Sequence, residues 1–200
     1  MKIDLHVHTI IGSPCSFIEI EELIERAKEL SLDAVCITEH NNYKGIKVTR
    51  ELSKKYNFLI LRGMEVRCLD GDVIIVEKSP QYFHHQETTI WELAQIIHKN
   101  QGIIYPVHPF RHGVPSIQDN LYNNLELDAI EILNGNCQES ENNQALKASN
   151  ELRLFGLGGS DAHSKNMIGK YITIFNHKIK NEKDLIKAIE QKDGQAVQLF

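Results

Sequence analysis

Asp4-Leu5-His6-Val7-His8-Thr9, close to the start of the chain, is the stretch on which the predicted fold depends. Side chains alternate between the two faces of a β-strand, so a strand here places Asp4, His6 and His8 on one face and apolar residues on the other. Two imidazoles spaced by two residues on one face can converge on a single metal ion. The stretch therefore predicts a strand whose polar face binds metal.

The composition is that of an ordinary globular protein, with 200 residues, 42% hydrophobic and 24% charged. This length suits one domain, so we expect residues 1–200 to form a single domain. The net charge of -5 argues against a broad basic surface for nucleic acid, which leaves nucleic acid open only as a substrate. The oligomeric state stays open.

Two further features concern the compartment of the protein. No apolar run reaches the roughly 20 residues of a membrane span, and Asp4 interrupts the position where a signal peptide needs its apolar core. The four cysteines, Cys15, Cys36, Cys68 and Cys137, include no close pair of the kind found in zinc fingers or redox motifs. We therefore expect a cytoplasmic protein with neither a membrane anchor nor a disulfide framework.

Apolar periodicity and turn residues divide the chain into alternating elements. After the opening strand, strands are predicted over 34–38, 58–66, 73–76, 103–107, 129–133, 155–159 and 171–175, and helices over 20–30, 44–55, 89–100, 139–151 and 182–191. The turn at Asp70-Gly71 predicts a hairpin that pairs two of these strands antiparallel. His84-His85 matches no motif, and a surface loop is predicted there.

The alternation of strands and helices predicts a parallel α/β architecture. Polar residues recur where strands end, and they come from the first strand through to the last. Such residues meet over one cavity in an α/β barrel, whereas an open doubly wound sheet gathers its ligands at one switch point. A closed ring is therefore favoured, and because 200 residues are few for eight βα units, the ring is expected to be a smaller or distorted barrel.

Five ordered stretches carry a family resemblance: Asp4-Leu5-His6-Val7-His8-Thr9, Ile37-Thr38-Glu39-His40, Gly63-Met64-Glu65-Val66, Val107-His108-Pro109 and Gly159-Ser160-Asp161-Ala162-His163. Together they resemble the successive motifs of the PHP (polymerase and histidinol phosphatase) superfamily. The resemblance spans nearly the whole chain. It implies a distorted seven-stranded (β/α) barrel, a cluster of two or three divalent metal ions and the hydrolysis of phosphate esters.

The resemblance also implies roles for individual residues. The ligands of a first ion would be His6, His8, Glu65 and Asp161. Glu65 would bridge to a second ion that also takes His108, while His40 and His163 would bind a third. Asp4 would orient a ligating imidazole, as carboxylates behind metal ligands commonly do. The implied catalytic residues are His6, His8, Glu65, Asp161 and His163.

Two positions depart from the family pattern. Many members have a histidine on the strand after the bridging glutamate, where this chain has Asp72. A carboxylate also coordinates metal, and its hardness makes manganese or iron plausible beside zinc. In the loop after His8 the family usually supplies an aspartate or histidine for the third ion, and here Ser13-Pro14-Cys15-Ser16 stands instead. Whether Cys15 is a ligand, and whether there are two ions or three, stays open.

The expected reaction is hydrolysis of a phosphate ester by a metal-activated water at a dinuclear or trinuclear site on the C-terminal rim of the barrel. Two cations about 3.5 to 4 Å apart can clamp the phosphoryl oxygens and stabilise the leaving oxygen. The substrate is expected to be a small phosphomonoester or nucleotide, with Arg111, His112 and Asn134 as candidate contacts.

Two other functions stay open on the sequence. An amidohydrolase-type enzyme that cleaves C–N bonds also opens with His-x-His on its first strand and ends with a metal-binding aspartate. The short chain, the Gly-x-Glu motif and the extra His163 argue against that class. A non-catalytic module that keeps its metal for stability is the other alternative, and the departures at Asp72 and Cys15 give it some weight.

Overall fold

The computed structural model describes residues 1–78, 88–123 and 125–200. Its strands are β1 (Lys2–Val7), β2 (Ala34–His40), β3 (Leu59–Cys68), β4 (Gly71–Val76), β5 (Ile103–Pro106), β6 (Ala129–Asn134), β7 (Phe155–Gly159), β8 (Tyr171–Ile174) and β9 (Gln195–Gln198). Its helices are α1 (Ile20–Glu29), α2 (Ile46–Tyr56), α3 (Ile90–Lys99), α4 (Glu139–Leu152) and α5 (Glu182–Glu190), with short 3-10 turns η1 (Gln118–Tyr122) and η2 (Lys165–Met167). The predicted elements are confirmed to within a few residues, and β9 was not predicted.

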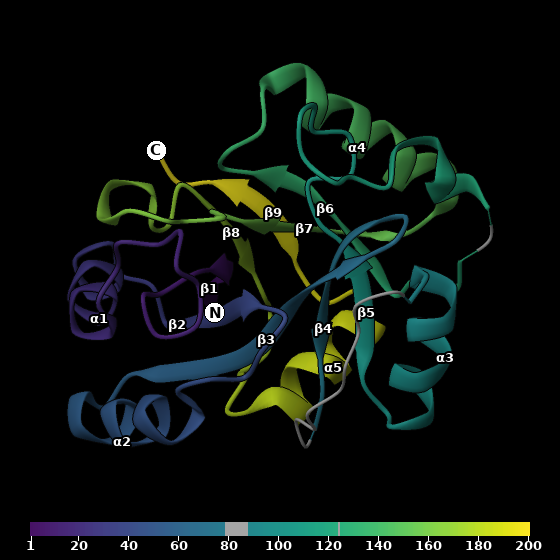
Figure 1. The fold of residues 1–200 in the computed structure, drawn as a ribbon. Coiled ribbons are helices and arrows are strands. Elements are labelled where there is room, and N and C mark those ends of the chain that lie inside the picture. Colours follow the sequence, from purple (N-terminus) through teal and green to yellow (C-terminus); the bar gives the residue numbers. More distant parts are fainter. Residues whose placement is uncertain (79–87, 124) are drawn as a thin grey trace.

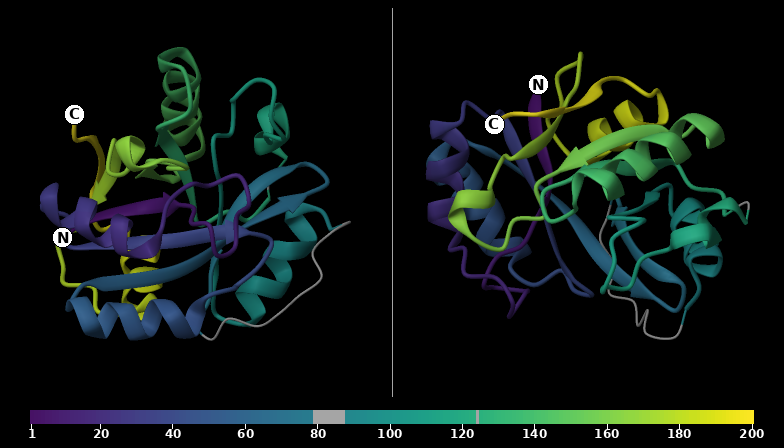
Figure 2. Two further views of the ribbon diagram at one scale, coloured as in Figure 1. Left: turned by 60° about the vertical axis from the view of Figure 1, so that its left-hand side comes forward. Right: turned by 90° about the horizontal axis from the view of Figure 1, so that it is seen from above.

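The strands form a mixed α/β fold built on a curled half-barrel sheet (Figures 1 and 2). Seven strands are joined in the order β5-β4-β3-β2-β1-β8-β9, and β6 pairs with β7 in a separate two-stranded sheet. Only β1 with β2 and β2 with β3 run parallel in the large sheet, whereas its other four pairings are antiparallel. The expectation of a mostly parallel, closed ring therefore needs correction, because the tight β3–β4 connection and the short β8 and β9 reverse the strand direction.

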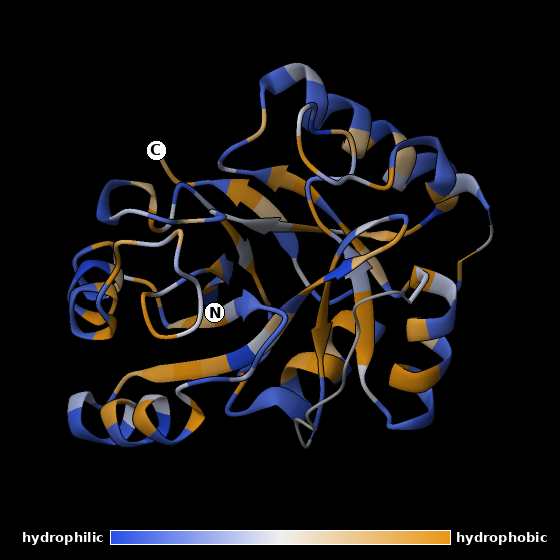
Figure 3. Ribbon diagram, viewed as in Figure 1, coloured by the Kyte–Doolittle hydropathy of each residue, from blue (hydrophilic) through white to orange (hydrophobic). Residues whose placement is uncertain are grey.

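Helices cover the curled sheet from outside and close one end of it (Figure 1). Apolar residues inside the curl pack on Leu185, Ile186 and Ile189 of α5. Outside it, α3 and α4 contribute to one buried cluster and α1 to another. Hydropathy follows this arrangement, since β4 and β5 are largely hydrophobic while α4 is largely hydrophilic (Figure 3). Burial of both sheet faces thus leaves the strand ends opposite α5 as the place for polar groups.

Local chemistry explains where several elements begin. Thr89 caps α3 in a reciprocal capping box with Glu92. Gly71 opens β4 with φ of 145°, and a Cβ there would lie 2.7 Å from the backbone nitrogen of Ile117, so glycine is required at this turn. Within the described ranges, no helix combines the length and apolarity needed to cross a membrane. His84-His85 lies outside the described residues.

Candidate metal centre

Backbone pairing brings predicted ligands from distant parts of the chain to one rim. In the parallel register of β2 and β3, His40 stands beside Glu65. At the end of β1, the N–H of His8 donates to the carbonyl of Ala162 at 3.0 Å, and an isolated bridge joins β1 to this segment after β7. The residues that flank Ala162 therefore lie next to the His-x-His motif, although more than 150 positions separate them along the chain.

The first group of metal-binding side chains consists of His6, His8 and Asp161, all buried. The Nε2 atoms of the two histidines lie 3.1 Å apart, and they lie 3.5 and 3.4 Å from Oδ1 of Asp161. Glu65 Oε2 completes this group at 3.3 Å from Nε2 of His8. The sequence-predicted ligands of the first ion are thus brought together.

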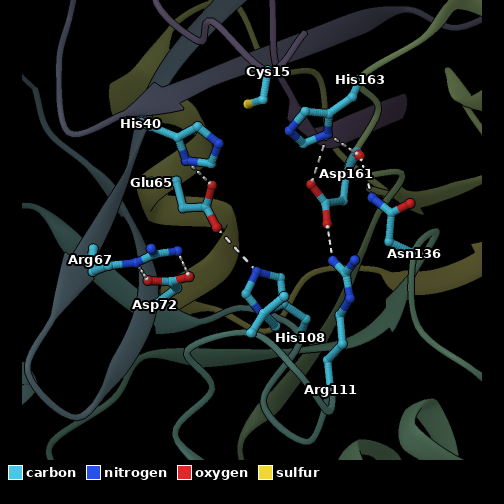
Figure 4. Close-up of a pocket in the computed structure, with 11 residues that line it drawn as sticks. Cys15, His40, Glu65, Arg67, Asp72, His108, Arg111, Asn136, Asp161 and His163 are labelled. Atoms are coloured by element: carbon cyan, nitrogen blue, oxygen red, sulfur yellow. Dashed lines mark hydrogen bonds and ion pairs between the residues drawn. The ribbon is translucent and has the colours of Figure 1, made fainter.

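A second group consists of Glu65, Asp72 and His108. Glu65 Oε1 lies 3.1 Å from Nε2 of His108, while its other oxygen faces the first group. Both oxygens of Asp72 accept hydrogen bonds from Arg67, each at 3.0 Å (Figure 4). Glu65 therefore lies between the two groups, as expected of a bridging carboxylate. Asp72 belongs to the second group and is also hydrogen-bonded to Arg67.

The third group consists of His8, His40 and His163. His40 and His163 are partly exposed, at 32% and 25%, and both rings stack on His8 with centroids 4.3 Å away. Cys15 lines the same cavity, but it joins none of the three groups found among the described residues. Partial burial, together with nearby carboxylates, raises the pKa of its thiol, so in this environment Cys15 favours the neutral form.

Hydrogen bonds behind the first group fix which nitrogen of His6 and of His8 faces Asp161. Nδ1 of His6 donates to the carboxylate of Glu131 at 3.0 Å. The Ser13 hydroxyl donates to Glu39 at 2.5 Å, so the same oxygen must accept from Nδ1 of His8 at 3.1 Å. In their neutral forms, both rings therefore keep the proton on Nδ1 and present the lone pair of Nε2 toward the carboxylate of Asp161.

The expectation that Asp4 orients an imidazole needs correction. Its carboxylate accepts hydrogen bonds from the backbone amides of Ser160, Gly169 and His6, at 2.9, 2.8 and 3.3 Å. The orienting carboxylate is Glu131, which the sequence analysis missed. The available indication was a single charge inside the apolar strand Ala129-Ile130-Glu131-Ile132-Leu133. Asp4 instead fixes the backbone just before the ligand Asp161.

The charges of the site are set by mutual contacts rather than by solvent. Burial alone would raise the pKa of Glu65, but hydrogen bonds from histidines, with His108 first, hold this pKa well below its usual range. Burial also opposes ionisation of Asp161, whose pKa is nevertheless lowered by His6 and His8. Burial would lower the pKa of His6, but the carboxylates of Asp161 and Glu131 raise it. Burial lowers the pKa of His8 to about 4. Glu65 and Asp161 are therefore ionised at neutral pH.

The groups open onto a cavity of about 370 Å³ (Figure 4). Arg111 lines this cavity, and its Nη1 donates to Oδ2 of Asp161 at 3.2 Å. Two predicted substrate contacts need correction. Asn134 is buried and donates to Glu131 and Asp161, so Asn136, two residues further along, takes its expected place in the wall. His112 is exposed on the surface and does not line the cavity.

The donor set fits divalent cations. Two imidazole lone pairs and a carboxylate oxygen lie close together in the first group, an arrangement in which a cation satisfies all three. Four buried carboxylates of the site face two arginines: Glu65, Asp72, Glu131 and Asp161 against Arg67 and Arg111. Buried negative charge in excess is costly unless cations balance it. The mixed nitrogen and oxygen ligands are compatible with zinc, manganese or iron.

Comparison with known proteins gives matches of sequence and of fold. Residues 139–193 match the family model described as PHP-associated. An uncharacterized protein of Methanocaldococcus jannaschii is 28% identical over 146 residues, which cover 67% of this chain and 82% of that protein. The PolC-type DNA polymerase III of Bacillus subtilis is 24% identical over 89 residues, which cover 44% of this chain and 6% of the polymerase. A structure from Bifidobacterium adolescentis, assigned as a metal-dependent phosphoesterase, superposes with a TM-score of 0.69 at 14% identity and covers 96% of both chains.

Proposed function

The chain belongs to the PHP superfamily, and on this basis we propose that it is a metal-dependent phosphoesterase that hydrolyses a small phosphate ester. The observation that carries the proposal is the convergence of three groups of histidine and carboxylate side chains on one cavity. The phosphoesterase assigned to the similar structure from Bifidobacterium adolescentis supports the same reaction class.

Under this proposal His6, His8 and Asp161, together with Glu65, would hold the first ion. Glu65, Asp72 and His108 would hold a second ion. When bound, such a pair of cations supplies clamping of the phosphoryl oxygens, activation of a water molecule and charge stabilisation of the leaving oxygen. The remaining work of the site belongs to the side chains of the chain itself.

A third ion is proposed at His40 and His163, at the more exposed side of the cavity. The Nδ1 of His163 donates to the backbone carbonyl of Asp161 at 2.9 Å, so its Nε2 is available as a ligand. Cys15 lines the same cavity but joins none of the three groups found among the described residues, so we do not assign it as a ligand. The third position thus rests on imidazoles alone and is expected to be the weakest of the three.

Arg111 is the side chain proposed to bind the phosphate group. One N–H of its guanidinium is held by Asp161, which fixes its position at the cavity wall while the other donors remain for a ligand. A guanidinium matches the oxygens of a phosphate in geometry and charge. Arg111 would therefore orient the ester next to the carboxylate and histidines that hold the metal.

The size of the cavity supports a small substrate. Its volume of about 370 Å³ is at the lower end of the range of ligand pockets, which suits a phosphomonoester or a nucleotide. A nucleic-acid end remains a candidate, since only its terminal nucleotide would need to enter. The chemistry of the leaving group is the part of the proposal that substrate screening must supply.

The test is hydrolysis by metal-free protein reloaded separately with Mn²⁺, Zn²⁺ or Fe²⁺. We expect phosphate release from an aryl phosphate or a panel of nucleotides and sugar phosphates, and its loss in His8→Ala. His177→Ala, which removes an imidazole that is 81% exposed and outside the site, is the matched control and should retain activity.

The same assay separates the alternatives. Cleavage of an anilide or other amide without phosphate release would favour the amidohydrolase class. Bound metal without turnover on either substrate panel would favour a non-catalytic module. Either result would contradict the proposed phosphoesterase.

A further inference from the structure

Glu131 is a buried glutamate in β6. It does not line the cavity, but hydrogen bonds connect it to three of the proposed metal ligands. Its side chain is 2% exposed, and its two carboxylate oxygens serve different partners. Oε1 accepts from the ring Nδ1 of His6 at 3.0 Å. Oε2 accepts from the backbone N–H of His108 and from Nδ2 of Asn134, both at 2.8 Å. One carboxylate thus joins a ligand of the first ion to a ligand of the second.

Two of the connected ligands have an unusual backbone conformation. His108 has φ of 34° and Asp161 has φ of 51°, in the left-handed region that non-glycine residues seldom adopt. Such conformations persist where the surroundings hold them in place. Glu131 bonds the backbone of His108 directly, and through Asn134 it reaches the carboxylate of Asp161, to which Nδ2 of Asn134 donates at 3.4 Å.

We propose that Glu131 is a positioning residue for the metal centre, which fixes the ring and tautomer of His6 together with the backbone of His108. It contacts neither substrate nor ion and acts only through these ligands. The inference rests on the metal positions of the proposed function. It predicts that the charge of Glu131, and not only its shape, is needed for metal binding.

The substitution Glu131→Gln separates charge from shape. A glutamine has one acceptor oxygen and one donor NH₂ group, whereas all the partners of Glu131 are donors. If the oxygen keeps its two bonds to His108 and Asn134, the NH₂ group faces His6 and requires an unprotonated Nδ1. The ring proton must then move to Nε2, the atom that faces the first metal position. The volume of the side chain is nearly unchanged, so packing is preserved.

The test compares Zn²⁺ binding to the wild type, Glu131→Gln and a matched control, Glu141→Gln. Glu141 is a buried glutamate that caps α4 and accepts from the N–H of His112, outside the metal groups. Calorimetric titration should show Zn²⁺ affinity reduced about 10- to 100-fold in Glu131→Gln and unchanged in the control. Imidazole ¹⁵N spectra of metal-free protein, recorded above the pKa of His6, should show the Nδ1–H tautomer in the wild type and the Nε2–H tautomer in Glu131→Gln.

Wild-type Zn²⁺ affinity and an unchanged His6 tautomer in Glu131→Gln would overturn the inference. If this variant does not fold, Asn134→Ala and the wild-type spectrum decide. Asn134→Ala should retain the Nδ1–H tautomer while binding Zn²⁺ more weakly, and an Nε2–H tautomer in the wild type would refute the role of Glu131. These readouts do not depend on turnover, so failure of phosphate hydrolysis would count against the proposed function and not against Glu131.

Discussion

Gly159 at the end of β7 lies so close to His6 that its replacement tests how tightly the first metal position is held. A Cβ at residue 159 would lie 2.5 Å from Cβ of His6 and 2.9 Å from Oε1 of Glu131. Carbon atoms prefer separations of 3.5 to 4.0 Å, so Gly159→Ala must widen this contact by about 1 Å. Because the displaced atoms carry the imidazole, the ring must leave its place between Glu131 and the cavity.

The expected cost has two parts. Overpacking of this kind costs about 1–3 kcal/mol of the free energy of unfolding. For a chain of this size, that loss lowers the melting temperature by roughly 2–12 °C, at about 2–4 °C per kcal/mol. Misplacing His6 should in addition weaken Mn²⁺ binding about 10- to 100-fold, the usual effect of disturbing the groups behind a metal ligand.

The assay is a Mn²⁺ titration combined with thermal unfolding, with Gly113→Ala as the control. Gly113 has φ of 79° and a Cβ there would meet nothing within 4 Å, so alanine adds backbone strain of about 1–2 kcal/mol without a clash. The control should lose stability but keep its Mn²⁺ affinity. Wild-type Mn²⁺ affinity in Gly159→Ala would refute the claim that close packing behind His6 positions the metal ligand.

Three further outcomes follow from contacts in the site. Arg67→Met should tighten Mn²⁺ binding severalfold, since Asp72 loses two competing N–H donors; weaker binding would show instead that Arg67 orients Asp72 for the ion. Arg111→Met should raise KM for the phosphate ester at least about tenfold, the value of a hydrogen bond to a charged group, and an unchanged KM would exclude a phosphate contact. Removing metal with a chelator should lower the melting temperature by roughly 5–11 °C. The reference is protein with free metal at about 100 times the metal Kd, where binding stabilises the fold by about 2.7 kcal/mol. Identical melting curves would contradict a metal site built into the fold.

The features that the sequence predicted correctly are those that depend on the residue types within a short stretch of chain. The alternation in residues 4–9 correctly predicted a strand with His6 and His8 together, and polar residues at strand ends correctly marked one rim. Helix positions were also predicted correctly from the apolar spacing, because residues three and four positions apart form the packed face of each helix. These features depend on local periodicity, which a single sequence displays directly.

What the sequence did not reveal depends on contacts between distant segments. The curled sheet ends in antiparallel strands at both of its edges, and no local pattern distinguishes such an edge strand from a parallel one. Glu131 hydrogen-bonds to His6 across 125 positions of the chain, and only folding brings these two residues near each other. Asn134 is a second example. Its place at the end of a strand was predicted correctly, but its side chain is buried and donates to Glu131 instead of lining the cavity.

The central claim is that the clustered histidines and carboxylates hold divalent ions that enable phosphate ester hydrolysis. The most direct measurement is stepwise reloading of metal-free protein with Mn²⁺, with bound ions counted by elemental analysis and phosphate release measured on the same samples. We expect no release without metal and a rise in release as the second equivalent of Mn²⁺ binds. Release that is independent of bound metal, or fully loaded protein that hydrolyses no phosphate ester, would contradict it.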